Sequence, residues 1–174
     1  MLIDVTVSAL LIDSSTEQPV LLLQERGGER SMPIVIGLAE AGAIAAILEG
    51  IPFPRPMTHD LFRSTLHALD ARVVRVVITA LRDDTFYASL HLEGPSGPVQ
   101  LDARPSDAIA LALRFAATVH VEAALFEACC ITPEAPAEDV AHAPIMTVPP
   151  GMDADELRKY LENLDTKEFG KYKV

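Results

Sequence analysis

The run from Asp102 to Asp107 gathers two carboxylates, the guanidinium of Arg104 and the hydroxyl of Ser106 in one short stretch. The apolar residues before it predict a strand, and those after it recur at the spacing of a helix that begins at Pro105. At such a corner both carboxylates could reach one small site and serve a metal ion or act as a general base. The plainer alternative is that Ser106 and Asp107 only occupy the start of a helix, where the dipole favours a negative charge.

A second charged corner lies in the run from Pro54 to Leu61, which contains Arg55, His59 and Asp60. Histidine has an unperturbed pKa near ~6.5, so His59 could act as a general acid or base near neutrality. Asp60 or another neighbour would hold its tautomer. The alternative is that His59 and Asp60 simply occupy the first turn of a capped helix.

Strands and helices on either side must position these two corners. Apolar periodicity and turn residues predict strands over 1–12, 20–25, 32–36, 72–81, 85–92, 99–103 and 119–121, and helices over 38–49, 58–69 and 105–115. The core face predicted for the helix over 58–69 consists of Leu61, Thr65, Leu66 and Leu69. The segment 123–130 has no clear pattern.

The two halves of the chain align without a gap when one is shifted by 65 residues. Each half has two strands and a short helix, with a further strand leading in, which predicts an internal duplication. The first copy lacks the acids of the second, and Glu40 is the only acid in its corresponding helical turn. We therefore expect an α+β fold in which duplicated strand-strand-helix units form a mixed or antiparallel sheet with helices packed on it.

Length and composition predict one folded domain and a tail. The chain has 174 residues, of which 49% are hydrophobic, and no long apolar run. This favours a domain over 1–131, a proline-rich linker or strap over 132–152, and a short amphipathic helix over 153–174. The absence of a basic leader or an apolar span predicts a cytoplasmic protein that does not bind membranes, and the adjacent Cys129 and Cys130 support neither a disulfide framework nor a zinc site.

The formal charge of -11 argues against loose, charge-driven binding to nucleic acid. Arginine is nevertheless the only basic residue besides histidine in residues 1–132, because every lysine lies later in the chain. Arginine binds phosphate in a bidentate manner, so a local basic pocket is compatible with this bias. Genome composition explains the bias equally well.

Five motifs occur in a characteristic order along the first 130 or so residues. They are Met32-Pro-Ile-Val-Ile-Gly, Glu40-Ala, Pro54-Arg-Pro-Met-Thr-His-Asp-Leu, Asp83-Asp-Thr-Phe-Tyr-Ala and Asp102-Ala-Arg-Pro-Ser-Asp-Ala-Ile-Ala-Leu-Ala. In these motifs the chain resembles the bifunctional nuclease (BFN) domain family. The resemblance implies an α+β domain with nuclease activity on DNA and RNA. The segment from Asp155 to Tyr172 resembles the first half of a UVR-type helical motif whose second helix is missing.

The resemblance and the clustered acids together predict a phosphodiester hydrolase. The predicted catalytic residues are His59, Asp60, Arg104, Asp107 and Asp102, and the predicted substrate-binding residues are Arg55 and Ser106. A divalent metal ion, Mg²⁺ or Mn²⁺, would be held by Asp102, Asp107 and Glu40. The predicted partner is a DNA or RNA substrate.

Two other functions fit the same residues. The corner at Arg104 and Ser106 could bind an anion or a partner's carboxylate without catalysis, as a regulatory module. Alternatively, Asp102, Arg104 and Asp107 could form an internal ion-pair network while the function lies elsewhere. Exposed strand edges and the apolar tail helix favour a homo-oligomer, with a dimer as the simplest form.

Overall fold

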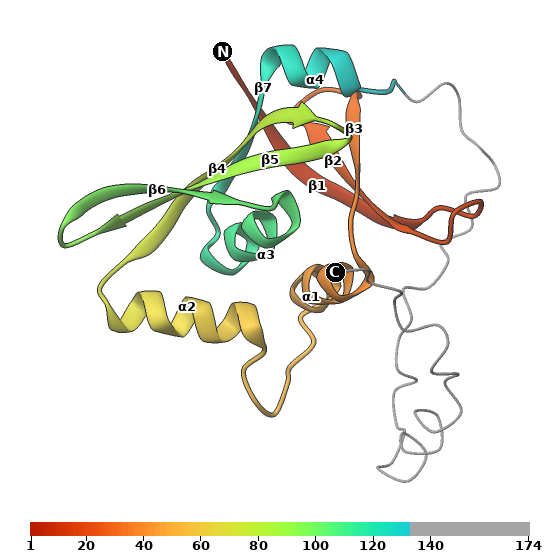
Figure 1. The fold of residues 1–174 in the computed structure, drawn as a ribbon. Coiled ribbons are helices and arrows are strands. Elements are labelled where there is room, and N and C mark those ends of the chain that lie inside the picture. The colour runs from red at the N-terminus through yellow and green to blue at the C-terminus, as the bar shows by residue number, and fades with distance from the viewer. Residues whose placement is uncertain (133–174) are drawn as a thin grey trace, which may run out of the picture. The chain divides into compact units, whose positions relative to one another are not determined.

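The computed structural model describes residues 1–132, which form an α+β fold with one seven-stranded mixed sheet and helices packed on it (Figure 1). The strands are β1 (Leu2–Ile12), β2 (Pro19–Glu25), β3 (Ser31–Val35), β4 (Arg72–Arg82), β5 (Thr85–Gly94), β6 (Gly97–Ala103) and β7 (Thr118–Glu122). The helices are α1 (Leu38–Leu48), α2 (Thr58–Ala68), α3 (Pro105–Phe115) and α4 (Ala123–Cys129).

The sheet joins two similar halves through a central strand. Its order is β3-β2-β1-β7-β4-β5-β6, so that β1 to β3 and β4 to β6 each form an antiparallel meander. The central β7 pairs antiparallel with β1 and parallel with β4. The mixed sheet with packed helices confirms the predicted fold class. The internal duplication stays a prediction, because a repeated element order does not by itself establish common descent.

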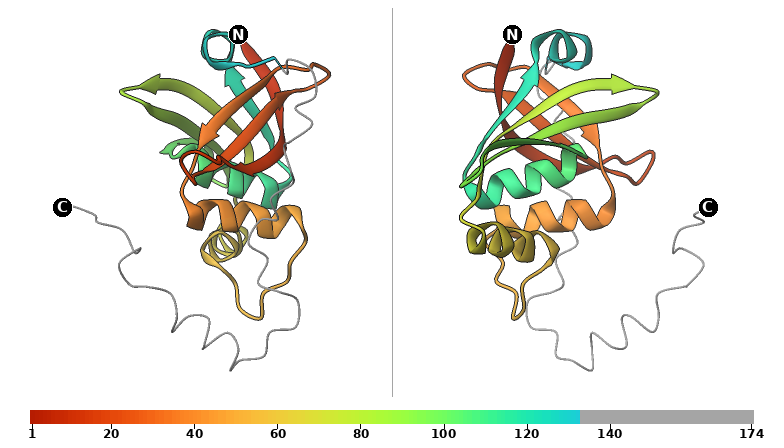
Figure 2. Two further views of the ribbon diagram at one scale, coloured as in Figure 1. Left: turned by 90° about the vertical axis from the view of Figure 1, so that its right-hand side faces the viewer. Right: turned by 60° about the vertical axis from the view of Figure 1, so that its left-hand side comes forward.

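Helix α3 lies between the sheet and the two helices α1 and α2 (Figure 2). Its side chains are small on the faces that must approach other elements closely, and Ala108, Ala110 and Ala112 are all fully buried. Small residues allow a helix axis to come near a sheet on one side and other helices on the other. The first turn of α3 is thereby placed where the starts of α1 and α2 can reach it.

The hydrophobic core contains residues of the sheet and of all four helices. The largest fully buried side chains are Phe126, Leu21, Leu23, Met32, Ile34, Ile44, Ile78, Ile109, Val5, Val76 and Val121. The register of β1 shifts between Val7 and Ala9, and β4 has two similar shifts. Such irregularities bend and twist a strand, so the sheet can curve around α3.

The core face predicted for α2 is wrong. Only Leu66 of this helix is buried, whereas Leu61 and Leu69 are 60% and 63% exposed. Helical periodicity identifies an apolar stripe but does not say whether another element covers it. In the described part of the chain, α2 is therefore a peripheral helix that needs other contacts to stay in place.

Several predictions concern the end of the chain. The segment that carried no clear pattern forms α4, which packs against β7 and β1.

Within residues 1–132, no helix combines the length and the apolar character that crossing a membrane requires. The strap predicted over 132–152, apart from Thr132, and the helix with its UVR-like segment over 153–174 lie outside the described residues.

Candidate active site

The two charged corners predicted from the sequence meet in the structure. His59 lies in the first turn of α2 and Asp107 in the first turn of α3. The Nε2 atom of His59 is 3.1 Å from Oδ1 of Asp107, which is a hydrogen-bond distance. The side chain of His59 is only 14% exposed. A carboxylate on one ring nitrogen fixes the orientation of an imidazole, so Nδ1 remains as the nitrogen that can exchange a proton.

Rigid backbone precedes both side chains. The connector between α1 and α2 contains three prolines, which restrict it to extended conformations before the helix starts. Arg104 is extended, with φ -68° and ψ 142°, and Pro105 follows as the first residue of α3. Proline suits this position because its fixed φ matches a helix and its missing N–H needs no partner there. The restricted backbone therefore helps to fix the positions from which the side chains of His59 and Asp107 extend.

Arg104 links this pair to a third helix. Its Nε atom is 2.6 Å from Oδ2 of Asp107, and its Nη1 atom is 2.8 Å from Oε1 of Glu40 in the first turn of α1. Glu40, His59, Arg104 and Asp107 thus connect the N-terminal turns of α1, α2 and α3, and we refer to these four residues as the polar network. The guanidinium of Arg104 stays accessible, since its side chain is 66% exposed.

The charges of the polar network stabilise one another. Burial alone would raise the pKa of Asp107, but hydrogen bonds from Arg104 and His59 outweigh it and the pKa is lowered. The hydrogen bond to Asp107 is also the main reason that the pKa of Arg104 is raised, and Glu40 adds to this effect. Asp107 is therefore ionised at neutral pH and can stabilise a positive charge on the imidazole.

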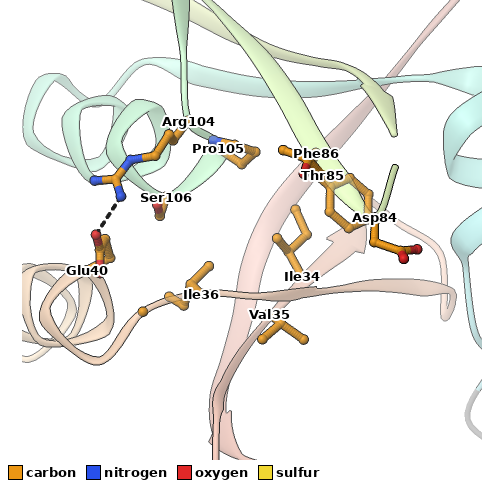
Figure 3. Close-up of a pocket in the computed structure, with 11 residues that line it drawn as sticks. Ile34, Val35, Ile36, Glu40, Asp84, Thr85, Phe86, Arg104, Pro105 and Ser106 are labelled. Carbon is orange, nitrogen blue, oxygen red and sulfur yellow. Dashed lines mark ion pairs between the residues drawn. The ribbon is translucent and has the colours of Figure 1, made fainter. Parts of the chain in front are cut away.

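A hollow of about 230 Å³ adjoins the polar network (Figure 3). Its walls come from the end of β3, the start of α1, the β4–β5 turn and the first turn of α3. Arg104 and Glu40 border it, and Ser106, which is 7% exposed, lines it. His59 and Asp107 do not line the hollow and connect to it through Arg104. The hollow is thus lined by one guanidinium and one hydroxyl, together with the carboxylates of Glu40 and Asp84.

Gly37 leaves room for the carboxylate of Glu40. A Cβ atom at Gly37 would overlap that carboxylate. The backbone of Gly37 is extended, with φ -74°, so space and not an unusual conformation accounts for the glycine. The glycine before the helix over 38–49 is therefore a sequence signal that points to Glu40.

The ligand set predicted for a metal ion is not assembled as one group. Glu40 and Asp107 are joined through Arg104, while Asp102 is exposed on β6 opposite Ser89 and forms no ion pair with a residue of the described part. Within residues 1–132, no three His, Cys, Asp or Glu side chains are grouped so that they could hold a metal ion. The requirement for Mg²⁺ or Mn²⁺ stays a prediction.

The role predicted for Asp60 needs correction, because Asp107 and not Asp60 holds His59. Oδ1 of Asp60 is 2.6 Å from Nε of Arg114, and Oδ2 accepts a hydrogen bond from the backbone N–H of Met57. The hydrogen bond from Arg114 is the main reason that the pKa of Asp60 is lowered. Arg114 is 3% exposed and also donates to the carbonyls of Ala43 and Ala110. Asp60 therefore fastens α2 to α1 and α3.

The two predicted substrate-binding residues lie in different places. Ser106 lines the hollow beside the polar network. Arg55 is exposed in the connector before α2 and lines a second hollow, which is formed with that helix. Each of the two hollows therefore contains one of the predicted substrate-binding residues.

Sequence reasoning missed Arg114 and Asp84. Arg114 is a lone basic residue within the apolar stripe of α3, and this position is the signal that could have found it. Asp84 lines the first hollow and belongs to the two-residue turn between β4 and β5. Both residues of that turn, Asp83 and Asp84, have positive φ, as a type I′ hairpin turn requires.

Comparisons with known proteins place this chain in a family. The bifunctional nuclease domain matches residues 20–134. An uncharacterized protein of Mycobacterium tuberculosis (strain H37Rv) is 38% identical over 164 residues, which cover 94% of this chain and 93% of that protein. Bifunctional nuclease 1 of Oryza sativa subsp. indica and a bifunctional nuclease of Oryza minuta are each 28% identical over 114 residues, or 64% of this chain and 34% of theirs. The chain belongs to the bifunctional nuclease domain family.

Proposed function

We propose that this protein is a nuclease that hydrolyses phosphodiester bonds of DNA or RNA. The observation that carries the proposal is the 3.1 Å contact between His59 and Asp107, two residues far apart in the sequence. Beside them, Arg104 is accessible and borders a hollow that Ser106 lines. An imidazole held by a carboxylate next to a guanidinium suits proton transfer at a phosphate whose charge must be neutralised. The names of the rice relatives point the same way.

The residues of the site divide the tasks of the proposed reaction. Nδ1 of His59 accepts a proton from a water molecule as the water oxygen bonds to phosphorus. The bond from phosphorus to the sugar oxygen breaks, and that oxygen receives the proton back from the imidazolium. Asp107 stabilises the imidazolium, while Arg104 and the hydroxyl of Ser106 stabilise the additional negative charge on the phosphate oxygens.

A divalent ion is not used in this scheme, because the donor set of residues 1–132 does not fit one. Glu40 and Asp107 share the positive charge of Arg104, and Asp102 forms no ion pair there. A bound Mg²⁺ or Mn²⁺ would supply charge stabilisation at the phosphate. Its contribution is measured by comparing cleavage with added metal and with EDTA.

A non-catalytic module that binds anions is the second candidate, and one observation favours it. Arg104 pairs with both Glu40 and Asp107 and still exposes most of its side chain beside the hollow. Such a site can hold a phosphate or a partner's carboxylate without a metal ion. The chain's formal charge of -11 suits this better than tight binding of long nucleic acids.

The test of the nuclease is the variant His59→Gln in the full chain. We expect kcat for cleavage of a labelled single-stranded DNA or RNA oligonucleotide to fall by about 10²-fold or more, because no general base remains. The matched control is His91→Gln, since that half-buried imidazole hydrogen-bonds Ser89 and takes no part in the polar network. The control should keep its kcat.

The outcomes separate the candidates. Equal cleavage by wild type and His59→Gln contradicts the role of the histidine. Absence of cleavage by wild type with Mg²⁺, Mn²⁺ or EDTA, together with binding of inorganic phosphate, supports the anion-binding module and contradicts the nuclease. Loss of cleavage in EDTA alone shows that a metal ion is needed beyond the residues of the scheme.

A further inference from the structure

A second hollow, of about 550 Å³, lies along one face of α2. The helix contributes Asp60, Arg63, Ser64 and His67, which recur at the spacing of a single helical stripe. The connector before α2 contributes the remaining walls, namely Ile51, Phe53, Arg55 and Pro56. This volume is in the range of sites that hold small ligands. The proposed reaction scheme does not use this hollow.

Two arginines of this hollow have no carboxylate partner in the described part of the chain. Arg26, Arg30, Arg72, Arg104 and Arg114 all form ion pairs. Arg55 and Arg63 form none with residues 1–132, although both line the same hollow. In a chain with a formal charge of -11, two guanidinium groups at one place that lack a carboxylate partner within residues 1–132 make a local positive site. Guanidinium groups bind phosphate through paired hydrogen bonds.

One wall of the second hollow is apolar and exposed to solvent. Ile51 and Phe53 are 45% and 46% exposed, so both side chains are open to a ligand. An exposed aromatic ring beside cations is the arrangement on which unpaired bases stack. The bases of a duplex are already stacked on one another, so this wall favours a single strand.

The hollow and the polar network both include residues of the first turn of α2. Asp60 lines it, and the next residue toward the N-terminus is His59. Ser64 and His67 continue the same stripe along α2, and the ring of His67 lies 5.2 Å from that of Phe115. A strand bound along this face would therefore reach the first turn of α2, which also carries His59.

We propose that the second hollow is a nucleotide subsite for single-stranded nucleic acid, in which Arg55 and Arg63 bind backbone phosphates and a base stacks on Phe53. The inference rests on the proposed nuclease, since it names how that enzyme holds its substrate beside the scissile bond. It predicts that the chain binds unpaired nucleotides in preference to a duplex.

The test measures binding and not cleavage, so it is independent of turnover. The probe is a fluorescent hexathymidylate with phosphorothioate linkages, titrated with the full chain at several salt concentrations. We expect Arg55→Gln/Arg63→Gln to weaken binding about tenfold or more and to reduce the slope of log K against log salt by about 1.4, because two phosphate contacts are lost. Phe53→Leu should weaken binding about fivefold or more.

The matched control is Arg75→Gln/Arg82→Gln, which removes the same charge from β4, away from the hollow. Neither arginine forms an ion pair with a described residue, and Arg82 lies 5.3 Å from the ring of Tyr87. The control should change binding less than twofold. A duplex of equal length should bind more weakly than the single strand and should not respond to Phe53→Leu.

Three results would overturn the subsite. One is equal weakening by the two double variants, which would mean that only net charge matters. Another is equally tight binding of the duplex, and a third is competition by a polyglutamate peptide that is as effective as competition by thymidine oligonucleotide. If binding follows the prediction but no condition yields cleavage, the subsite stands and the nuclease proposal fails.

Discussion

At the scale of single residues, the site depends on two aspartates with separate tasks. Asp107 holds the imidazole of His59, and Asp60 holds the guanidinium of Arg114. Both carboxyl groups have a lowered pKa. Asp107 owes this to hydrogen bonds that outweigh the opposing effect of burial, and Asp60 owes it mainly to Arg114. One aspartate therefore serves the proposed chemistry and the other serves the fold.

The variant Asp107→Asn separates these tasks. The amide keeps the shape of the side chain but removes the negative charge that stabilises an imidazolium at His59. We expect kcat for oligonucleotide cleavage to fall by about 10² to 10⁴-fold, as when the acid of a catalytic triad is neutralised. Steady-state kinetics measure the effect, and a melting curve shows whether the variant is folded.

Asp102→Asn is the matched control, because it makes the same substitution at the exposed acid that begins the same run. Little change in kcat is expected. A loss equal to that of Asp107→Asn would mean that Asp102 takes part in catalysis, as the sequence alone predicted.

The sequence identified His59 and Asp107 but not that they are partners. Asp60 is adjacent to His59 in the sequence, which made it the natural candidate. Consecutive residues on a helix point in different directions, so Asp60 meets Arg114 in the last turn of α3 while His59 meets Asp107 in its first turn. Arg114 was missed because burial of a lone arginine depends on tertiary contacts that local patterns do not contain.

At the scale of elements, α2 is held by polar contacts more than by apolar burial. Leu66 is its only buried residue, while Asp60 joins Arg114 and His59 joins Asp107. Arg114 in turn donates to the carbonyl of Ala43 in α1. A helix with so little buried apolar surface depends on these contacts for its position.

Asp60→Ala should therefore release α2. The substitution leaves the buried guanidinium of Arg114, which is 3% exposed, without its carboxylate. Removing one partner of a fully buried pair typically costs about 3 to 5 kcal/mol of unfolding free energy, and we expect the lower end here because Asp60 is 34% exposed. Urea unfolding measures the loss, and amide hydrogen exchange should show faster exchange in α2 than in α3.

Two further variants make this result interpretable. Glu93→Ala breaks the exposed pair with Arg72 and should cost about 1 kcal/mol or less. Asp60→Ala/Arg114→Met removes both charges and should recover part of the stability. If Asp60→Ala costs no more than Glu93→Ala, the pair with Arg114 does not hold the helix.

Most element boundaries could be predicted from the sequence because they depend on local patterns. The helix predicted over 105–115 is confirmed as α3, and the hairpin strands predicted from Arg72 and Thr85 are β4 and β5. The exposed face of α2 could not be predicted, since exposure depends on which other elements cover it. Helix α4 carried too short a pattern to be recognised.

At the scale of the whole molecule, the insertion of β7 between β1 and β4 brings the two halves together. Because α3 leads into β7, its first turn comes to lie beside α1 and α2, which belong to the other half of the sequence. Such long-range pairing is not contained in local patterns, so the sequence predicted two charged corners without fixing their distance.

Acidification should weaken the whole fold through the two aspartates. Because the folded-state pKa of Asp60 and of Asp107 is lowered, their stabilisation is fully present above the unfolded value of about 4 and is lost as pH falls through the lowered values. We expect the Tm of wild type to exceed that of Asp60→Asn/Asp107→Asn at about pH 6, and this difference to shrink below about pH 4. Relief of charge repulsion on acidification affects both proteins nearly equally, so the difference in Tm reports on the two carboxylates. A difference that stays constant down to about pH 2.5 would mean that these ion pairs do not stabilise the fold.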